Sequence, residues 1–310
     1  GIQYVHMDAG WYGPEMKMSS DATTVSSDKD LDIPALCKYA ESKGIGLMVY
    51  VNQRALVQQL DILLPLYKKW GLKGIKFGFV QIGNQRWSTW LHDAVRKCGE
   101  YNLMVDIHDE YRPTGFSRTY PNLMTQEGIR GNEEMPDATH NTTLPFTRYL
   151  AGAGDYTLCY FNNRVKNTKA HQLAMAAVYY SPLQFMFWYD RPEFYQGEEE
   201  LEFWKAIPSV WDDSRALDGE IGEYIVQARR SGNDWFVGAM TNTEARTITL
   251  TTDFLEPGKK YMLHLYEDDD KLNTRTKVRS THKKIKAGDK LVLKLKASGG
   301  AALHFTPLKK

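Results

Sequence analysis

The sequence predicts an α/β fold: a (β/α)8 barrel over residues 1–216, entered at about its second strand, and an all-β domain over residues 217–310. In the first part, short apolar runs typical of strands alternate with longer helical patterns. Three of these runs begin near residues 46, 73 and 103, a spacing that one strand and one helix fill together. Repeated units of this kind form a parallel sheet. After about residue 217, helical periodicity gives way to short alternating runs separated by turns, which predicts an antiparallel β-sandwich.

The composition argues against several classes of protein. The 310 residues include 39 Lys and Arg and 38 Asp and Glu, so a net charge of +1 creates no global field that would attract nucleic acid or an anionic membrane. No apolar run approaches the ~20 residues of a membrane-spanning helix. Cys37, Cys98 and Cys159 are odd in number and follow no metal-ligand spacing, which argues against a disulfide framework or a structural zinc site.

Seven strands and four helices are expected in the first part. Asp32 is placed to cap the first helix, with Pro34 in its first turn. A closed barrel needs eight strands. Because the chain opens directly in a strand and without Met, we expect the eighth strand before Gly1, in a longer protein. The strands cover about 2–7, 46–51, 73–80, 103–108, 122–126, 155–159 and 183–188, and the helices about 33–43, 56–70, 85–99 and 168–180.

An open, doubly wound sheet is the alternative to a barrel. It is disfavoured because no glycine-rich phosphate loop follows any early strand. The lysines of the C-terminal domain are interpreted as edge-strand charges that oppose aggregation, rather than as a site for a polyanion. The strands of this domain are expected near 224–228, 235–240, 247–250, 260–265, 291–295 and 302–305.

In a barrel, chemistry takes place at the carboxyl ends of the strands, and here these ends are polar. The first predicted strand ends in Asp8-Ala9-Gly10-Trp11. An indole beside a carboxylate suits a sugar, because the ring stacks on the apolar face of the sugar while the carboxylate accepts hydrogen bonds from its hydroxyls. A tryptophan packed into the barrel rim explains Trp11 equally well.

The strand around Lys76 places a charged side chain inside the predicted barrel. Because side chains alternate, Phe77 and Phe79 should face the helices, while Lys76 and Gly78 face the lumen. A buried ammonium needs an anionic partner from the protein or from a ligand. Gly78 is either a point of close backbone approach or a catalytic position that lacks its side chain.

Two further strand ends carry carboxylates. One groups His108 with three acids, Asp106, Asp109 and Glu110. At the other, Glu127 ends the strand, and Glu133 follows through a loop bracketed by glycines. Carboxylates gathered in this way fit calcium, which takes about 6–8 oxygen ligands. They also fit acid–base catalysis in which one glutamic acid is kept protonated. A solvated acidic loop without a catalytic role is the third interpretation.

Taken together, these motifs resemble glycoside hydrolase family 97, whose members are α-glucosidases and α-galactosidases. The resemblance implies that residues 2–215 form the family's barrel and that the tail forms its C-terminal β-domain. It also implies an N-terminal β-sandwich upstream and a periplasmic or secreted bacterial protein. The matching stretches are Tyr4–Trp11, Gly71–Lys76, His108–Gly115, Arg118–Asn122, Glu127–Glu133 and Leu144–Arg148.

The resemblance also implies roles for individual residues. Glu133 matches the general acid or acid/base of the family, and Lys76 and His108 match positions that contact the sugar. Glu127 and Asp109 match ligands of a Ca²⁺ ion, with a further ligand from the N-terminal domain. The expected substrate is an oligosaccharide or galactoside; neither nucleic acid nor a membrane span is expected.

Gly78 departs from the family's pattern. Retaining members carry an Asp nucleophile at this position, whereas inverting members have Gly there and use two glutamates as bases. Here Val51-Asn52-Gln53-Arg54, after the family's third strand, contains no glutamate, and Asp109 stands next to His108 in place of the other. Since the surrounding residues resemble the retaining α-galactosidase subgroup, we expect a retaining α-galactosidase whose nucleophile is replaced by Gly78. Such a chain should be impaired, and azide or formate should fill the cavity at Gly78.

Two other functions are compatible with the sequence. One is an inverting α-glucosidase of the same family that uses Asp109 or another acid as its base. The other is a non-catalytic carbohydrate-binding protein that retains a degenerate barrel.

Overall fold

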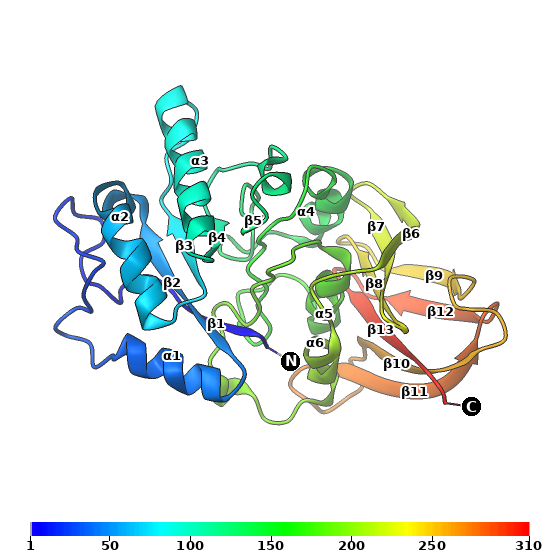
Figure 1. Ribbon diagram of the computed structural model, residues 1–310. Helices are drawn as coiled ribbons and strands as arrows, with labels where there is room; N and C mark the ends of the chain where they lie inside the picture. Colours follow the sequence, from blue (N-terminus) through cyan, green and yellow to red (C-terminus); the bar gives the residue numbers. More distant parts are fainter. Residues whose placement is uncertain (1, 310) are drawn as a thin grey trace. The chain divides into compact units, whose positions relative to one another are not determined.

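A computed structural model of the chain describes residues 2–309 (Figure 1). The chain divides into two compact units, which are described separately below. The first unit comprises Ile2–Ile129 and Ala153–Asp155, and the second comprises Arg130–Gly152 and the residues from Tyr156 onward. The predicted domain boundary after residue 216 falls inside strand β6 (Asp213–Glu220) and stays a prediction.

The first unit contains a parallel sheet of five strands in the order β1-β2-β3-β4-β5. A doubly wound sheet reverses its strand order at one point, whereas a barrel keeps the order of the chain. The observed order therefore supports the predicted barrel topology. The strands are β1 (Tyr4–Met7), β2 (Gly46–Asn52), β3 (Gly74–Gly78), β4 (Met104–Ile107) and β5 (Leu123–Gln126), and the helices are α1 (Ile33–Ser42), α2 (Gln53–Trp70) and α3 (Gln85–Glu100).

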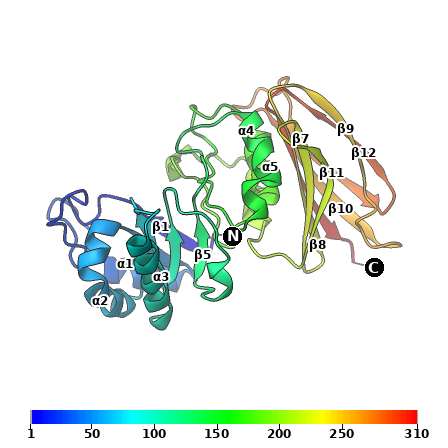
Figure 2. The ribbon, with the colours of Figure 1, turned by 90° about the horizontal axis from the view of Figure 1, so that it is seen from above.

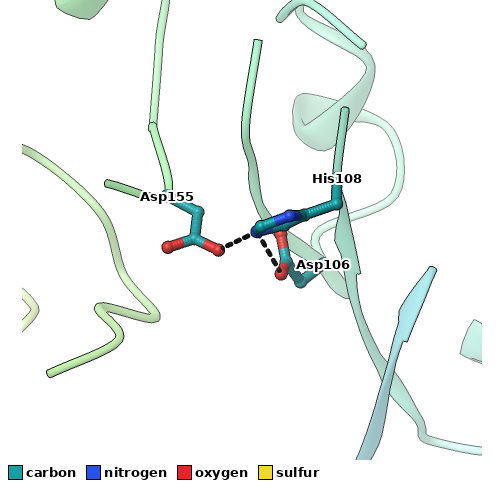
Figure 3. Close-up of side chains that lie close together, drawn as sticks. All are labelled: Asp106, His108 and Asp155. Carbon is teal, nitrogen blue, oxygen red and sulfur yellow. Dashed lines mark hydrogen bonds and ion pairs between the residues drawn. The ribbon is translucent and has the colours of Figure 1, made fainter. Parts of the chain in front are cut away.

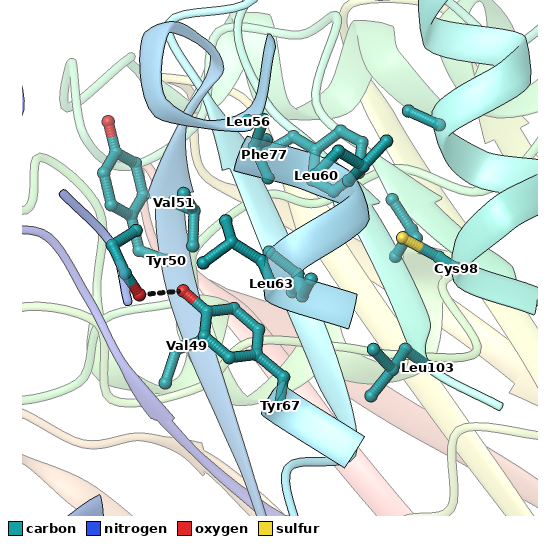
Figure 4. Close-up of a cluster of buried hydrophobic side chains, with 14 of the residues drawn as sticks. Val49, Tyr50, Val51, Leu56, Leu60, Leu63, Tyr67, Phe77, Cys98 and Leu103 are labelled. Carbon is teal, nitrogen blue, oxygen red and sulfur yellow. Dashed lines mark hydrogen bonds between the residues drawn. The ribbon is translucent and has the colours of Figure 1, made fainter. Parts of the chain in front are cut away.

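Local capping decides where the helices begin. The Asp32 side chain accepts a hydrogen bond from the Ala35 N–H at 2.9 Å, as expected for α1. Helix α2 begins at Gln53, earlier than predicted, because the Asn52 side chain caps it. The buried stripe of α2 packs against the helix-facing side of β2 and β3 (Figure 4). This core includes Leu56, Leu60, Leu63 and Tyr67 of α2 and Val49, Val51 and Phe77 of the sheet.

Three sequence-based predictions about strands are wrong. The segments 155–159 and 183–188 are not strands, because Thr157 (φ 58°) and Phe187 (φ 60°) adopt left-handed conformations that interrupt an extended chain. The two segments still exchange backbone hydrogen bonds, since Leu158 N–H donates to Phe185 O at 3.0 Å. Phe79 does not face the helices: β3 ends at Gly78, and Phe79 turns to φ 52° with 52% of its surface exposed.

The second unit contains the predicted antiparallel sandwich. A six-stranded sheet in the order β11-β10-β13-β8-β7-β6 and the pair β12-β9 enclose an apolar core (Figure 2). The sequence analysis missed β6 and β11, whose polar and charged side chains show little alternation. The remaining strands are β7 (Tyr224–Ser231), β8 (Asp234–Thr241), β9 (Arg246–Thr251), β10 (Lys260–Asp268), β11 (Val278–Lys286), β12 (Lys290–Leu295) and β13 (Gly300–Pro307).

Helix α5 (Lys169–Val178) packs on the six-stranded sheet of this unit, whose helices also include α4 (Ala138–Thr143) and α6 (Glu202–Ala206). A Cβ on Gly238 would overlap the carbonyl oxygen of Ala174, so only glycine permits this approach. At the end of α5, the Arg229 guanidinium donates to the carbonyls of Ala177 and Val178 at 2.7 and 3.0 Å. Among residues 2–309, no helix combines the length and apolarity that a membrane span requires.

Candidate active site

The face of the parallel sheet opposite the helices carries buried polar side chains. The strand register aligns Tyr50 with Lys76, and Lys76 with Asp106. Lys76 is 2% exposed, whereas its neighbour Phe77 lies on the other face, where its ring approaches that of Trp90 of α3. The prediction that Lys76 points away from the helices is therefore confirmed.

Lys76 has a protein carboxylate as its partner. Its Nζ lies 3.4 Å from Oδ2 of Asp8, at the carboxyl end of β1. The Lys76 side chain is 3% exposed, while that of Asp8 is 41% exposed. The pair thus extends from the buried face of the sheet to its rim, where the carboxylate is open to solvent.

Trp11 does not provide an open surface for a sugar, and its assignment as a substrate-binding residue is wrong in this structure. Its indole is 2% exposed, and its Nε1–H donates to the carbonyl oxygen of Tyr50 at 2.7 Å. The ring contacts Tyr12 edge-on at 4.9 Å between centroids, and Tyr67 and Trp70 complete the aromatic cluster. The alternative interpretation of a packed tryptophan describes it correctly.

His108 lies in a buried cluster with two aspartates (Figure 3). Its Nε2 is 2.6 Å from Oδ2 of Asp155 and 3.9 Å from Oδ2 of Asp106. Burial alone would lower the pKa of His108, but the ion pair with Asp155 outweighs this effect and raises the pKa to about 9. Burial, together with the nearby Asp155, raises the pKa of Asp106 well above its usual value. The cluster thus favours the protonated forms of His108 and Asp106.

The predicted metal ligands Glu127 and Asp109 lie together at the ends of β5 and β4. The backbone N–H of Asp109 donates to Oε2 of Glu127 at 2.6 Å, and Oδ2 of Asp109 accepts from the Val80 N–H at 2.8 Å. His108 Nδ1 lies 3.3 Å from the same Glu127 oxygen. These bonds fix two partly exposed carboxylates in place. Glu127 thus contacts the backbone of Asp109, while the Asp109 carboxylate binds Val80, and a calcium ion shared by the two carboxylates stays a prediction.

Glu133 belongs to the second unit, where its loop is firmly held. Asn132 N–H donates to the carbonyl oxygen of Tyr156 at 3.0 Å, and its side-chain amide donates to Oε1 of Gln172 at 2.9 Å. A Cβ on Gly131 would lie 2.6 Å from the Tyr156 carbonyl oxygen, so this glycine allows the loop to approach closely. The other predicted polar residues thus lie in the first unit. The loop that carries Glu133 is held by residues of the second unit.

Gly78 does not border an open cavity. A Cβ built on Gly78 would overlap Cε2 and Cζ of Tyr50 and lie 2.5 Å from its hydroxyl oxygen. The cavity expected at Gly78 is therefore wrong in this structure, because a side chain from the neighbouring strand fills it.

Sequence analysis placed Asp106 in a polar cluster with His108, as observed, but missed Tyr50 and Asp155 as members of the polar face. Asp106 precedes His108 by two residues, and strand alternation places both on one face. Tyr50 precedes Asn52 in the same way. Asp155 gave no such indication, because it reaches His108 from 47 positions away in the sequence.

Comparisons with known proteins connect this geometry to a family. The model described as "Glycoside hydrolase 97" matches residues 1–129, and "Glycosyl-hydrolase 97 C-terminal, oligomerisation" matches residues 210–306. A retaining α-galactosidase of Bacteroides thetaiotaomicron is 32% identical over 98% of this chain and 48% of its own length. A probable retaining α-galactosidase of Streptomyces bingchenggensis is 31% identical over 99% of the chain and 48% of its own.

A solved structure extends the comparison. A glycoside hydrolase family 97 enzyme from Pseudoalteromonas sp. strain K8, in complex with panose, is 31% identical with a TM-score of 0.88, over all of this chain and 54% of its own. This likeness confirms the predicted fold class. The chain spans about half the length of the curated relatives that it matches.

Proposed function

We propose, from the premise that this chain belongs to glycoside hydrolase family 97, that it carries the catalytic barrel of a glycosidase acting on terminal α-galactosides. One observation carries the proposal: charged side chains are buried at the strand ends of a chain 32% identical to a retaining α-galactosidase. A domain that only binds a partner has little need to bury an ion pair such as His108–Asp155, because desolvation opposes it.

In this proposal Glu133 is the general acid/base. It protonates the glycosidic oxygen as the bond to the anomeric carbon breaks, and then removes a proton from the incoming water. Lys76, His108 and Asp8 contact the sugar hydroxyls. The Asp8 carboxylate offers a hydrogen-bond acceptor at the rim, and the buried Lys76 ammonium lies behind it.

Glu127 and Asp109 would hold the proposed calcium ion, with further ligands from outside the first unit. When bound, calcium supplies a fixed positive charge that orients sugar hydroxyls and influences the acidity of nearby groups. The backbone bonds described above hold these carboxylates in position without it. The periplasmic or secreted location and the N-terminal β-sandwich stay predictions from the family.

Gly78 limits the activity that we propose. A retaining mechanism requires a carboxylate to attack the anomeric carbon, and Gly78 supplies none. Each tenfold loss of rate corresponds to about 1.4 kcal/mol of barrier, and loss of a nucleophile removes several such factors. We therefore propose that this chain turns over galactosides slowly.

An inverting α-glucosidase is the second candidate, and one observation favours it. Tyr50 packs against Gly78, as expected where glycine belongs to the architecture rather than replacing a lost acid. The family 97 enzyme solved with panose is also 31% identical to this chain. In this case Asp109 or another acid activates a water molecule for direct displacement.

The test compares aryl α-galactoside with aryl α-glucoside as substrates, using the complete protein with calcium or with EDTA. We expect slow hydrolysis of the galactoside that EDTA reduces. Glu133→Gln should lower kcat/KM by at least about 100-fold. Glu134→Gln is the matched control, since Glu134 is an exposed acid paired with Arg130, and should leave the rate within about twofold.

The product anomer distinguishes the candidates. If NMR shows hydrolysis of the glucoside with inversion, the second candidate is correct. Sugar binding without turnover of either substrate would instead identify a carbohydrate-binding protein.

A further inference from the structure

The side chain of Tyr50 is anchored beside the end of β3. Tyr50 is 4% exposed, and alternation along β2 and β3 places it on the same face as Asn52, Lys76 and Gly78. Its carbonyl oxygen accepts the Trp11 indole hydrogen bond at 2.7 Å. The backbone of Tyr50 is therefore held in place by a buried aromatic cluster.

The polar tip of Tyr50 is also surrounded. Asn52 Nδ2 donates to its hydroxyl oxygen at 3.4 Å, and Lys76 Nζ lies 5.9 Å from the ring centroid. These neighbours flank the ring on the same face of the sheet, where almost none of its surface is exposed. A side chain on residue 78 therefore requires the tip of the Tyr50 ring to leave this buried position.

We infer that Tyr50 and residue 78 form a mutually exclusive pair that determines which chemistry the end of β3 supports. While Tyr50 holds its position, residue 78 must be glycine, and neither a protein carboxylate nor a small external anion reaches the anomeric carbon from this strand. The chemical consequence of this inference rests on the proposed function. The steric exclusion between Tyr50 and a side chain at position 78 does not.

Tyr50 itself does not replace the missing nucleophile. Burial, followed by the negative charge of Glu15, raises the pKa of the Tyr50 hydroxyl. The group therefore stays protonated at neutral pH, and its oxygen accepts the Asn52 hydrogen bond. Tyr50 is a steric determinant of the mechanism at this strand end.

A stability cycle tests the steric part without any assay of activity. Gly78→Ala is made in the original chain, in Tyr50→Phe and in Tyr50→Leu, which lacks the ring atoms that overlap the new Cβ. We expect Gly78→Ala to lower Tm by about 4 °C or more in the first two backgrounds, through overpacking, and by about 1 °C or less in Tyr50→Leu. If Tyr50→Leu does not fold, Tyr50→Ala takes its place. Equal losses in all backgrounds would overturn the inference.

An anion-rescue assay tests the chemical part with the complete protein and aryl α-galactoside. In Tyr50→Leu, azide attacks the anomeric carbon, the bond to the aryloxide breaks, and Glu133 donates the proton to the leaving oxygen, so that β-galactosyl azide forms. We expect azide to raise the rate at least about tenfold in this variant and to have no effect in the original chain or in Tyr50→Phe.

The two assays separate the failure of the inference from the failure of the proposed function. Azide rescue of the original chain to the level of Tyr50→Leu would overturn the inference, as would a large gain of activity from Gly78→Asp alone. If no variant cleaves either glycoside, the proposed function fails, and the stability cycle alone then decides whether Tyr50 and residue 78 exclude each other.

Discussion

The two sheets of this protein bury very different side chains. The parallel sheet of the first unit packs one face against helices with apolar residues and buries Lys76, Asp106 and His108 on the other. The antiparallel sheets of the second unit enclose a core of apolar side chains, such as Leu263 and Leu303. Burying charge rarely stabilises a protein beyond what an apolar core achieves. The polar face of the parallel sheet is therefore the one suited to catalysis, whereas the core of the sandwich serves stability.

The largest expected effect is the loss of the buried carboxylate that pairs with His108. Asp155→Ala leaves an imidazolium ion buried without its closest partner. We expect the free energy of unfolding to fall by about 3–5 kcal/mol, as measured by denaturant titration. Asp155→Asn is the control and should cost less, because the amide still offers an oxygen to His108. If Asp155→Ala costs no more than Asp155→Asn, the charge of Asp155 contributes little.

The apolar core of the sandwich provides the matched comparison. Leu303 of β13 is fully buried, so Leu303→Ala should leave a cavity and cost about 2–5 kcal/mol of unfolding free energy. It should leave glycosidase activity unchanged once the protein is folded, whereas Asp155→Ala should lower both. An activity loss at full occupancy of the folded state would show that the two regions are coupled.

Acid should weaken the second unit through a buried histidine. Burial lowers the pKa of His171 from 6.5 to about 4, and its Nδ1 lies 3.0 Å from the Gly299 carbonyl oxygen. Because the folded pKa is the lower one, the stabilising contribution is complete above pH 6.5 and is lost as pH falls towards 4. Linkage gives a loss of about 2 kcal/mol at pH 5, which pH-dependent denaturation would detect.

His171→Gln is the control for this titration, because glutamine cannot titrate. In this variant, the unfolding free energy should fall less steeply between pH 6.5 and 4, even if its value at pH 8 is lower than in the original chain. An unchanged slope would assign the acid sensitivity to another group.

The smallest effect is expected at an exposed ion pair of the first unit. Lys97 Nζ lies 2.7 Å from Asp61 and 3.6 Å from Asp93. Solvent screens such pairs, so Lys97→Met should change the unfolding free energy by less than about 1 kcal/mol. The same denaturant titrations as for Asp155→Ala measure this change. A larger loss of unfolding free energy would mean that burial does not explain the difference between the buried and the exposed ion pair.

Much of the fold follows from local sequence features. Asp32 and Pro34 correctly predicted the start of α1, and alternation around Lys76 correctly separated its side chain from that of Phe77. The prediction failed where non-glycine residues adopt left-handed conformations, as at Thr157 and Phe187. Such conformations are imposed by the surrounding structure, because the residue types themselves favour extended chain there.

The candidate site shows the same division. The sequence pattern alone places Asp8, Lys76, His108, Asp109 and Glu127 on the strands or at their ends, because parallel strands bring their carboxyl ends to one edge. Trp11 could not be assigned in this way: the same indole serves a core or a sugar, and only its 2% exposure shows which.

By itself, the sequence determined the parallel sheet, the sandwich, the family and most of the polar residues, since these depend on periodicity and on motifs. Only the tertiary structure decided that Asp155 pairs with His108 and that Tyr50 occupies the space beside Gly78. Both are contacts between segments that lie far apart in the sequence or on neighbouring strands. Their formation depends on register and on the volume that each side chain fills, which no local pattern along the chain records.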